Sequence, residues 1–176
     1  MPAAPPAKPA PRASWWYRLG THPAAALAGR LLVGAVFIVA GGSKLLLPPE
    51  EVEALLRQYP LPAAALPFIA RLLPWLELLS GTALFIGFYT TAAAALVAVQ
   101  LAAFSLLMGV VLVQGIPIAD CGCFGHLGVR ETPAQVLVRD VVLLALLGPV
   151  LWRRGDLLAV DAWHAAGDTH DGTPLA

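Results

Sequence analysis

Charged side chains are scarce in this sequence. Only 12% of its 176 residues are Asp, Glu, Lys or Arg, against roughly 25% in soluble domains. Apolar residues reach 59%, and the mean hydropathy is +0.75. Such a chain has too little polar surface for a water-soluble fold. The formal net charge of zero also gives no sign of the basic surface that binds nucleic acid, so we expect no nucleic-acid partner. The composition predicts a protein whose solvent is the lipid bilayer.

Cysteine is scarce too, and the chain contains only Cys121 and Cys123. Two cysteines are too few for a disulfide-rich scaffold or for a structural zinc site with four cysteine ligands. Lipid anchoring has no support either, because Pro2 stands where myristoylation needs glycine and no cysteine lies near the C-terminus. Whatever chemistry the two cysteines carry, they carry it as a pair.

Long apolar runs dominate the rest of the chain. A bilayer core of about 30 Å needs about 20 helical residues. Runs of suitable length and hydropathy occupy residues 24–47, 68–89, 92–114 and 136–152. We therefore predict an all-α integral membrane four-helix bundle over residues 23–153. It is flanked by a disordered N-terminal tail, residues 1–22, and a polar C-terminal tail, residues 154–176.

Residues 50–59 have a different pattern. Val52, Leu55, Leu56 and Tyr59 recur at helical spacing, whereas Glu50 and its polar neighbours take the other face. This pattern predicts a short amphipathic helix between the first and second spans, too short to cross the membrane. We expect it to lie on the membrane surface or to cap the bundle.

Small residues repeat every fourth position in the third span. Such stripes let membrane helices approach closely where no hydrophobic effect drives them together. The stripe predicts a helix-packing face made of Thr90, Ala94, Ala98 and Ala102.

Six charged residues fall within the predicted spans, Arg30 in the first span and five others toward the cysteine end. Charges at membrane depth usually pair with one another or line a polar cavity that has a function. One interpretation is a functional polar site at the cysteine end of the bundle. The other is that Glu77 pairs with Arg71, Lys44 or Arg139 only to lock the helices together. Asp140 follows Arg139 at the head of the last span.

The distribution of Lys and Arg gives a weak signal for orientation. The two tails contain five such residues, and the connection between the second and third spans has none. The positive-inside rule then favours cytoplasmic termini. The cysteine loop would face the outer side, where disulfides persist.

The spacing of the cysteines favours redox chemistry. A disulfide between Cys121 and Cys123 closes a very small ring, and strained disulfides are more easily reduced. Cations such as Lys44, His126 or Arg139 would favour the reactive thiolate. Two alternatives stay open. The cysteines could bind Cu(I) or zinc, with His126 and Asp120 as further ligands, or they could form a structural turn.

Four short segments stand out together: Gly41 to Lys44, Pro74 to Glu77, Asp120 to Gly125, and Arg139 with Asp140. They resemble the MauE group within the wider DoxX-like membrane proteins, over roughly residues 24–152. The Cys-Gly-Cys-Phe-Gly run is the most specific of these features.

The resemblance implies a four-helix protein of the bacterial inner membrane that is linked to methylamine utilisation. It also implies that the protein acts with a thioredoxin-like partner in the maturation of methylamine dehydrogenase. That enzyme would be a periplasmic client, and its small subunit is rich in disulfides. Cys121 and Cys123 would be the redox pair. The charge pattern adds supporting polar residues at the same end: Lys44, Glu77, Asp120, His126, Arg139 and Asp140.

We therefore predict a membrane thiol-disulfide redox protein with no resident metal or organic cofactor beyond the dithiol pair, although a quinone or a soft metal stays open. One alternative is a non-catalytic assembly or metal-binding factor. The other, from the wider DoxX-like resemblance, is a subunit of a quinone-linked respiratory complex.

Overall fold

A computed structural model describes residues 23–118, 121 and 131–152. Its elements are α2 (Pro23–Leu45), α3 (Pro49–Leu56), the 3-10 turn η1 (Ala63–Ala65), α4 (Leu66–Ile86), α5 (Thr90–Gln114) and α6 (Pro133–Trp152). Four segments are long and apolar enough to cross a membrane: Ala24–Leu45, Ala63–Ile86, Thr90–Gln114 and Pro133–Trp152. The predicted all-α membrane bundle is confirmed. Both predicted tails lie outside the described residues.

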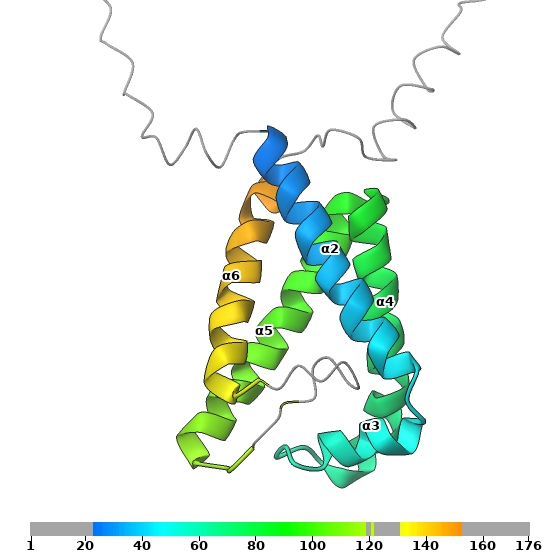
Figure 1. The fold of residues 1–176 in the computed structure, drawn as a ribbon, viewed down its shortest axis with the longest axis vertical. Helices are drawn as coiled ribbons and strands as arrows, with labels where there is room; N and C mark the ends of the chain where they lie inside the picture. The colour runs from blue at the N-terminus through cyan, green and yellow to red at the C-terminus, as the bar shows by residue number, and fades with distance from the viewer. Residues whose placement is uncertain (1–22, 119–120, 122–130, 153–176) are drawn as a thin grey trace, which may run out of the picture.

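The four long helices form a bundle in which α2 packs along α4 and α6, and α5 packs on α6 and α4. The start of α2 and the end of α6 lie at one end of the bundle, and α3 lies at the other (Figure 1). With four spans, the start of α2 and the end of α6 lie on the same side of the membrane. The short helix α3 packs against α4 at the far end, as a cap.

Several helix ends differ from those predicted. The helix α3 ends at Leu56 instead of Tyr59. Pro60 has no N–H to donate to the Leu56 carbonyl, which accepts a hydrogen bond from the Tyr59 N–H at 3.1 Å instead. The helix α4 ends at Ile86 instead of residue 89. Gly87 adopts φ 76°, and the Phe88 N–H donates to the Ala83 carbonyl at 2.9 Å, which closes the helix with a glycine cap.

The helix α6 begins at Pro133, three residues earlier than predicted. The Thr132 N–H donates to Gln135 Oε1 at 2.8 Å, and the Gln135 N–H donates to Thr132 Oγ1 at 3.4 Å. This reciprocal cap satisfies two N–H groups that a helix start otherwise leaves exposed. Proline is favoured at the first helical position that follows.

The predicted packing stripe on α5 is only half correct. Thr90 and Ala94 are buried, but Ala98 is half-buried and Ala102 is exposed. A repeat of four residues drifts by about 40° per step around a helix of 3.6 residues per turn, so its last member faces away. Close approaches of helices lie instead along α2, against both α4 and α6. A Cβ on Gly34 would lie 2.9 Å from Phe85 N, and one on Gly81 would lie 2.7 Å from Phe37 Cβ.

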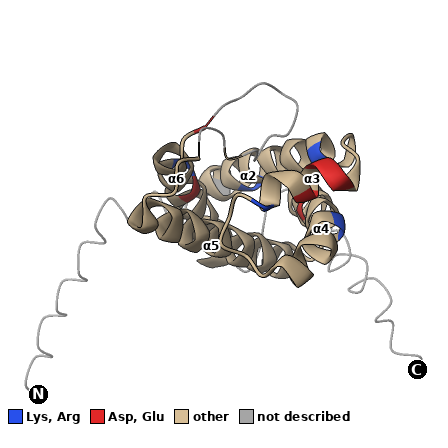
Figure 2. Cartoon of the chain, turned by 90° about the horizontal axis from the view of Figure 1, so that it is seen from below, with Lys and Arg blue, Asp and Glu red and all other residues tan. Residues whose placement is uncertain are grey.

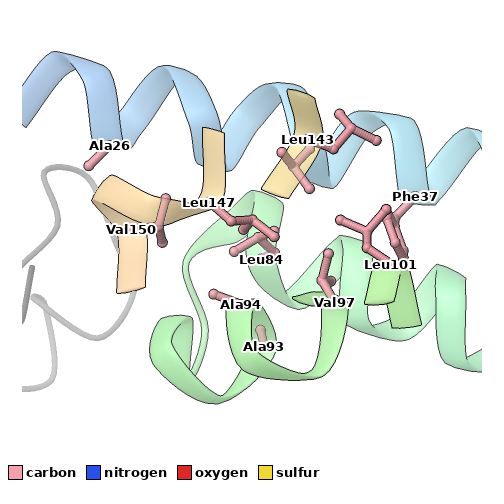
Figure 3. Packing of buried hydrophobic residues seen from close by; sticks show 11 residues of the cluster. Ala26, Phe37, Leu84, Ala93, Ala94, Val97, Leu101, Leu143, Leu147 and Val150 are labelled. Carbon is pink, nitrogen blue, oxygen red and sulfur yellow. The ribbon is translucent and has the colours of Figure 1, made fainter. Parts of the chain in front are cut away.

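Two apolar clusters fill the bundle, one in each half. The closed half, next to the first turn of α2, is built around small and branched residues from all four spans (Figure 3): Ala26, Val33, Phe37, Leu84, Ala93, Ala94, Val97, Leu101, Leu143, Leu147 and Val150. The cysteine half contains the residues around α3 and the cysteine loop: Leu47, Val52, Leu56, Tyr59, Leu66, Ala70, Met108, Val111, Ile118, Cys121 and Val136.

Candidate functional site

Cys121 is held against the inside of the cysteine half. Its side chain belongs to the apolar cluster, and the residue is only 5% exposed. Tyr59 Oη donates to the Cys121 carbonyl at 2.7 Å, and the Cys121 N–H donates to the Glu131 carbonyl at 3.2 Å. The backbone of Cys121 is therefore fixed from two sides, by the residues after α3 and those before α6. The other predicted loop residues, Cys123, Asp120 and His126, lie outside the described residues.

The thiol of Cys121 faces α5. Its Sγ lies 3.6 Å from Sδ of Met108, a residue with no exposed surface. Polarizable sulfur atoms pack favourably in irregular core space. A small cavity of about 20 Å³ adjoins the thiol, and its lining includes Lys44, Tyr59, Phe104 and Cys121. The structure thus brings the predicted residue Lys44 to the same cavity as Cys121.

Lys44 forms a buried ion pair with Glu77. Its Nζ donates to both carboxylate oxygens, at 2.8 and 3.1 Å, and the two residues are 6% and 3% exposed. Of the three partners considered for Glu77, Lys44 is thus the one that hydrogen-bonds it. Arg71 is exposed and donates instead to the Pro67 carbonyl one turn earlier in α4. The long side chain of an Arg near a helix end can extend along the helix so that its charged group reaches the membrane surface.

Arg139 and Asp140 form a second polar group at the start of α6. Asp140 has no exposed surface, and its Oδ1 accepts a hydrogen bond from Arg139 Nη2 at 3.0 Å. Ser105 Oγ of α5 lies 3.5 Å from Asp140 Oδ2. Arg139 also pairs with the Glu131 carboxylate. Because the Glu131 carbonyl holds the Cys121 N–H, Glu131 links the cysteine backbone to this charged group.

The two charged groups line one internal cavity. Its volume is about 30 Å³, and its polar lining consists of Glu77, Arg139 and Asp140. A cavity of this size with several polar partners is large enough for one or two water molecules. Phe104 lines both this cavity and the one beside Cys121. The buried charged layer, as we call Lys44, Glu77, Arg139 and Asp140, therefore lies around two cavities that share Phe104, one of which Cys121 also lines.

Charged positions elsewhere are few. Viewed from the cysteine end, charged positions lie on α2, α3, the adjoining part of α4 and the start of α6 (Figure 2). Arg30 on α2 is buried as well, at 2% exposure. The pair between Arg57 and Glu53 on α3 is largely exposed, at 2.7 Å. Exposed pairs of this kind contribute little to stability.

A metal centre has no support in the described part of the chain, where no three His, Cys, Asp or Glu residues lie close enough together to hold an ion. The soft-metal alternative named Cys121, Cys123, Asp120 and His126. Three of those four residues lie outside the described segments, so the alternative stays a prediction.

Sequence reasoning did not identify Tyr59, Met108, Ser105 or Glu131 as site residues. Tyr59 carries a usable signal, because it ends the apolar face of an amphipathic segment and has a hydroxyl that needs a partner when buried. Glu131 is an acidic residue of the cysteine loop, eight positions before Arg139. Met108 and Ser105 lie in an unbroken apolar run and give no signal of their own.

Comparison with known proteins adds one positive finding. Residues 22–153 match the sequence model of a family described as Methylamine utilisation protein MauE. No curated protein and no solved structure matches the chain significantly. The match covers the whole bundle, including all four spans and the cysteine loop. The chain therefore belongs to the MauE family and is a multi-pass membrane protein associated with methylamine utilisation.

Proposed function

We propose that the protein exchanges disulfides with a thioredoxin-like partner through Cys121 and Cys123. The partner lies on the outer, periplasmic side of the inner membrane. The main support is the position of Cys121, whose backbone is held by Tyr59 and Glu131 in front of the buried charged layer. A nearby cation stabilises a thiolate, and Lys44 lines the same cavity as Cys121. The fixed backbone holds the Cys121 thiol in one position beside that cavity.

The exchange proceeds through a mixed disulfide. A thiolate of one protein attacks a sulfur of the other protein's disulfide, so that one S–S bond forms between the proteins as one S–S bond breaks. The released sulfur leaves as a thiolate and takes up a proton. The second cysteine of the attacking protein then attacks its neighbour's sulfur as a thiolate, which forms an S–S bond within that protein and releases the other protein's remaining sulfur as a thiolate. A disulfide has then moved from one protein to the other.

The burial of Cys121 separates the roles of the two cysteines. At 5% exposure its sulfur is too enclosed to meet a disulfide on a partner protein. We therefore assign the contact with the partner to Cys123 and the resolving step to Cys121. The strained disulfide expected between them is easily opened, because deviations from relaxed geometry raise its reduction potential.

Single-cysteine variants test this division. In Cys121→Ser the remaining Cys123 should accumulate a mixed disulfide with its partner, visible as a reducible adduct on non-reducing gels and identifiable by mass spectrometry. The Cys123→Ser variant should form little adduct, and the double variant none. Equal adducts in the two single variants would contradict the assignment, and no adduct in either would contradict exchange.

We further propose that both termini lie in the cytoplasm. Five Lys and Arg residues lie in the tails and five lie toward the cysteine end. Two of the latter, Lys44 and Arg139, are paired within the bundle and so are not loop charges of the kind that the positive-inside rule counts. The tails then hold the excess. A membrane-impermeant thiol reagent applied to intact cells should reach Cys123, and labelling only after the cells are broken would reverse this orientation.

The client we propose is methylamine dehydrogenase, through the maturation of its disulfide-rich subunit. The family supports a link to methylamine, and the cysteine pair supports a role in disulfide formation. A strain in which both cysteines are replaced by serine should produce membrane-inserted protein but no mature enzyme during growth on methylamine.

The burial of Cys121 also favours a second candidate, a non-catalytic assembly factor whose cysteine half serves as a packed docking surface. The double serine variant separates the two functions. An assembly factor should still support maturation of its client, whereas an exchange catalyst should not.

A further inference from the structure

The ion pair of Lys44 and Glu77 connects the two cavities of the buried charged layer. Lys44 lines the cavity of about 20 Å³ that Cys121 also lines, and Glu77 lines the neighbouring cavity of about 30 Å³. Hydrogen bonds of 2.8 and 3.1 Å join Lys44 Nζ to the two carboxylate oxygens of Glu77. The pair therefore links the surroundings of the Cys121 thiol to a buried carboxylate.

Burial restricts how Cys121 can lose its proton. A resolving thiol attacks only as a thiolate, but Cys121 is 5% exposed, so bulk water has little access to its sulfur. The cavity beside it, at about 20 Å³, is large enough for one water molecule. Lys44 and Tyr59 supply an ammonium and a hydroxyl in its lining. One water there can bridge the thiol and Lys44 Nζ.

The other charged groups near this pair come from α6 and the residues just before it. Arg139 and Asp140 line the cavity of Glu77, and Asp140 accepts a hydrogen bond from Arg139 at 3.0 Å. Arg139 also pairs with Glu131. The residues of α3 and α5 that line the two cavities in the described structure are all apolar. Glu77 is thus the carboxylate that faces Lys44, and Asp140 is held by a different cation.

Lys44 is placed to serve two anions in turn. If the thiol proton moves to Glu77, the carboxylate becomes neutral and the Cys121 thiolate becomes the anion beside Lys44. The net charge of the three groups stays the same, so the transfer avoids the cost of an uncompensated buried charge. Protonation also turns one of the two oxygens that accept from Lys44 Nζ into a donor, which leaves one ammonium N–H for the thiolate.

We propose that Cys121 and Glu77 share one proton through Lys44, so that Glu77 holds the proton while the Cys121 thiolate exists. The proposal rests on the thiol exchange proposed above and deepens it by naming the proton acceptor of the resolving thiol. The S–H bond breaks and leaves its electron pair on sulfur. The proton passes to the cavity water, the water gives one to Lys44, and Lys44 gives one to Glu77. One O–H bond has then formed on Glu77, and the water and the ammonium are unchanged.

The pH dependence of thiolate formation tests the shared proton. The full-length protein in nanodiscs carries Cys123→Ser, which leaves Cys121 as its one thiol. Ultraviolet absorbance measures the thiolate, after subtraction of the spectrum of the double serine variant. Two groups that share a proton titrate together in two steps. The Cys123→Ser protein should therefore form thiolate in two steps. Adding Glu77→Gln should leave one step, at a lower pH than the upper of the two, because the carboxylate that competes for Lys44 is removed.

The variant Lys44→Met, Glu77→Met in the same protein decides the test if Glu77→Gln does not fold, because it leaves neither charge of the pair buried alone. It should also show one step, at least about one pH unit above that of Glu77→Gln, since the cation is gone. The matched control is Arg57→Met, Glu53→Met, which removes a pair on α3 that lines neither cavity in the described structure. It should keep both steps. A single step in the Cys123→Ser protein, or two steps in Lys44→Met, Glu77→Met, would overturn the proposal.

The titration also separates failure of this proposal from failure of the proposed function. If the mixed disulfide with the partner forms but Cys121 titrates in a single step, the shared proton is wrong and disulfide exchange stands. If Cys121 titrates in two steps but no mixed disulfide forms, the shared proton stands and the exchange function is wrong.

Discussion

The two halves of the bundle differ in how closely α5 packs against the neighbouring helix α4. In the closed half, glycine allows backbones to touch: a Cβ on Gly29 would lie 2.3 Å from the Leu146 carbonyl oxygen. In the cysteine half, α2 stays close to α4, where a Cβ on Gly41 would lie 2.6 Å from Leu78 N, but α4 and α5 diverge. This half contains α3, two small cavities and an open apolar groove between α4 and α5. Both halves hold buried charge, since Arg30 beside Gly29 is only 2% exposed. The comparison therefore teaches that the divergence of α4 and α5, rather than the presence of charge, gives the cysteine half its groove. Four predictions test this difference, in order of decreasing expected effect.

The largest effect is expected in the charged layer. Lys44→Met leaves the Glu77 carboxylate buried without its ion-pair partner, and such a loss costs about 3–5 kcal/mol. The double variant Lys44→Met, Glu77→Met should recover most of that stability, because an apolar pair of similar volume replaces both charges. The unfolding temperature of each purified variant in detergent is the measurement. A double variant as unstable as the single one would contradict a self-contained pair.

The next effect concerns close packing in the closed half. Gly29→Ala forces α2 away from α6 and should cost about 1–3 kcal/mol, the usual penalty for overpacking. Gly148→Ala on α6 is the control, because a Cβ there meets nothing within 4 Å. It should be neutral or stabilising by up to about 1 kcal/mol. Thermal unfolding measures both. If Gly29→Ala is as stable as its control, the close contact is not a structural constraint.

A smaller effect is expected at the cysteine backbone. Tyr59→Phe removes the hydroxyl that holds the Cys121 carbonyl and should cost about 1 kcal/mol. Alkylation of Cys121 should become faster, because the segment that buries the thiol is less firmly held. Mass spectrometry after timed alkylation gives the rate. Tyr89→Phe is the control, since Tyr89 is exposed in the connection at the other end. Equal rates in the two variants would show that the Tyr59 hydrogen bond does not restrain Cys121.

The smallest effect is expected between α4 and α5. Gln100 Nε2 donates to Ser80 Oγ at 3.0 Å in the buried interface. Hydrogen bonds between membrane helices contribute about 0.6 kcal/mol on average. Ser80→Ala should therefore lower stability only slightly, and a double-mutant cycle with Gln100→Leu measures the coupling. A coupling of several kcal/mol would show that this contact, rather than the glycines, holds the closed half together.

Much of the fold was predictable because hydropathy is a local property. The four spans and α3 follow from runs of apolar residues and from the spacing of Val52, Leu55 and Leu56. The helix ends were less certain, because a glycine cap such as Gly87 or a capping box such as Thr132 with Gln135 overrides hydropathy over a few residues. The DoxX-like relationship stays a prediction.

The candidate site was only partly predictable, because pairing depends on which helix faces meet. The sequence placed Lys44, Glu77, Arg139 and Asp140 toward the cysteine end, but it left three possible partners for Glu77. It also gave no cavity and no groove, since these arise where α4 and α5 diverge. The need for glycine where α2 meets α4 likewise depends on the distance between the two helices. The spacing of residues within one helix does not predict that distance.

The most direct test of the account is the redox state of Cys121 and Cys123 in living cells. Rapid acid quenching followed by alkylation with a mass-tagged maleimide reports how many thiols are reduced. We predict that both cysteines are protected as a disulfide in aerobic cells and that both are labelled after treatment with a thiol reductant. Identical labelling under oxidising and reducing conditions would contradict the central claim that this pair carries out disulfide exchange.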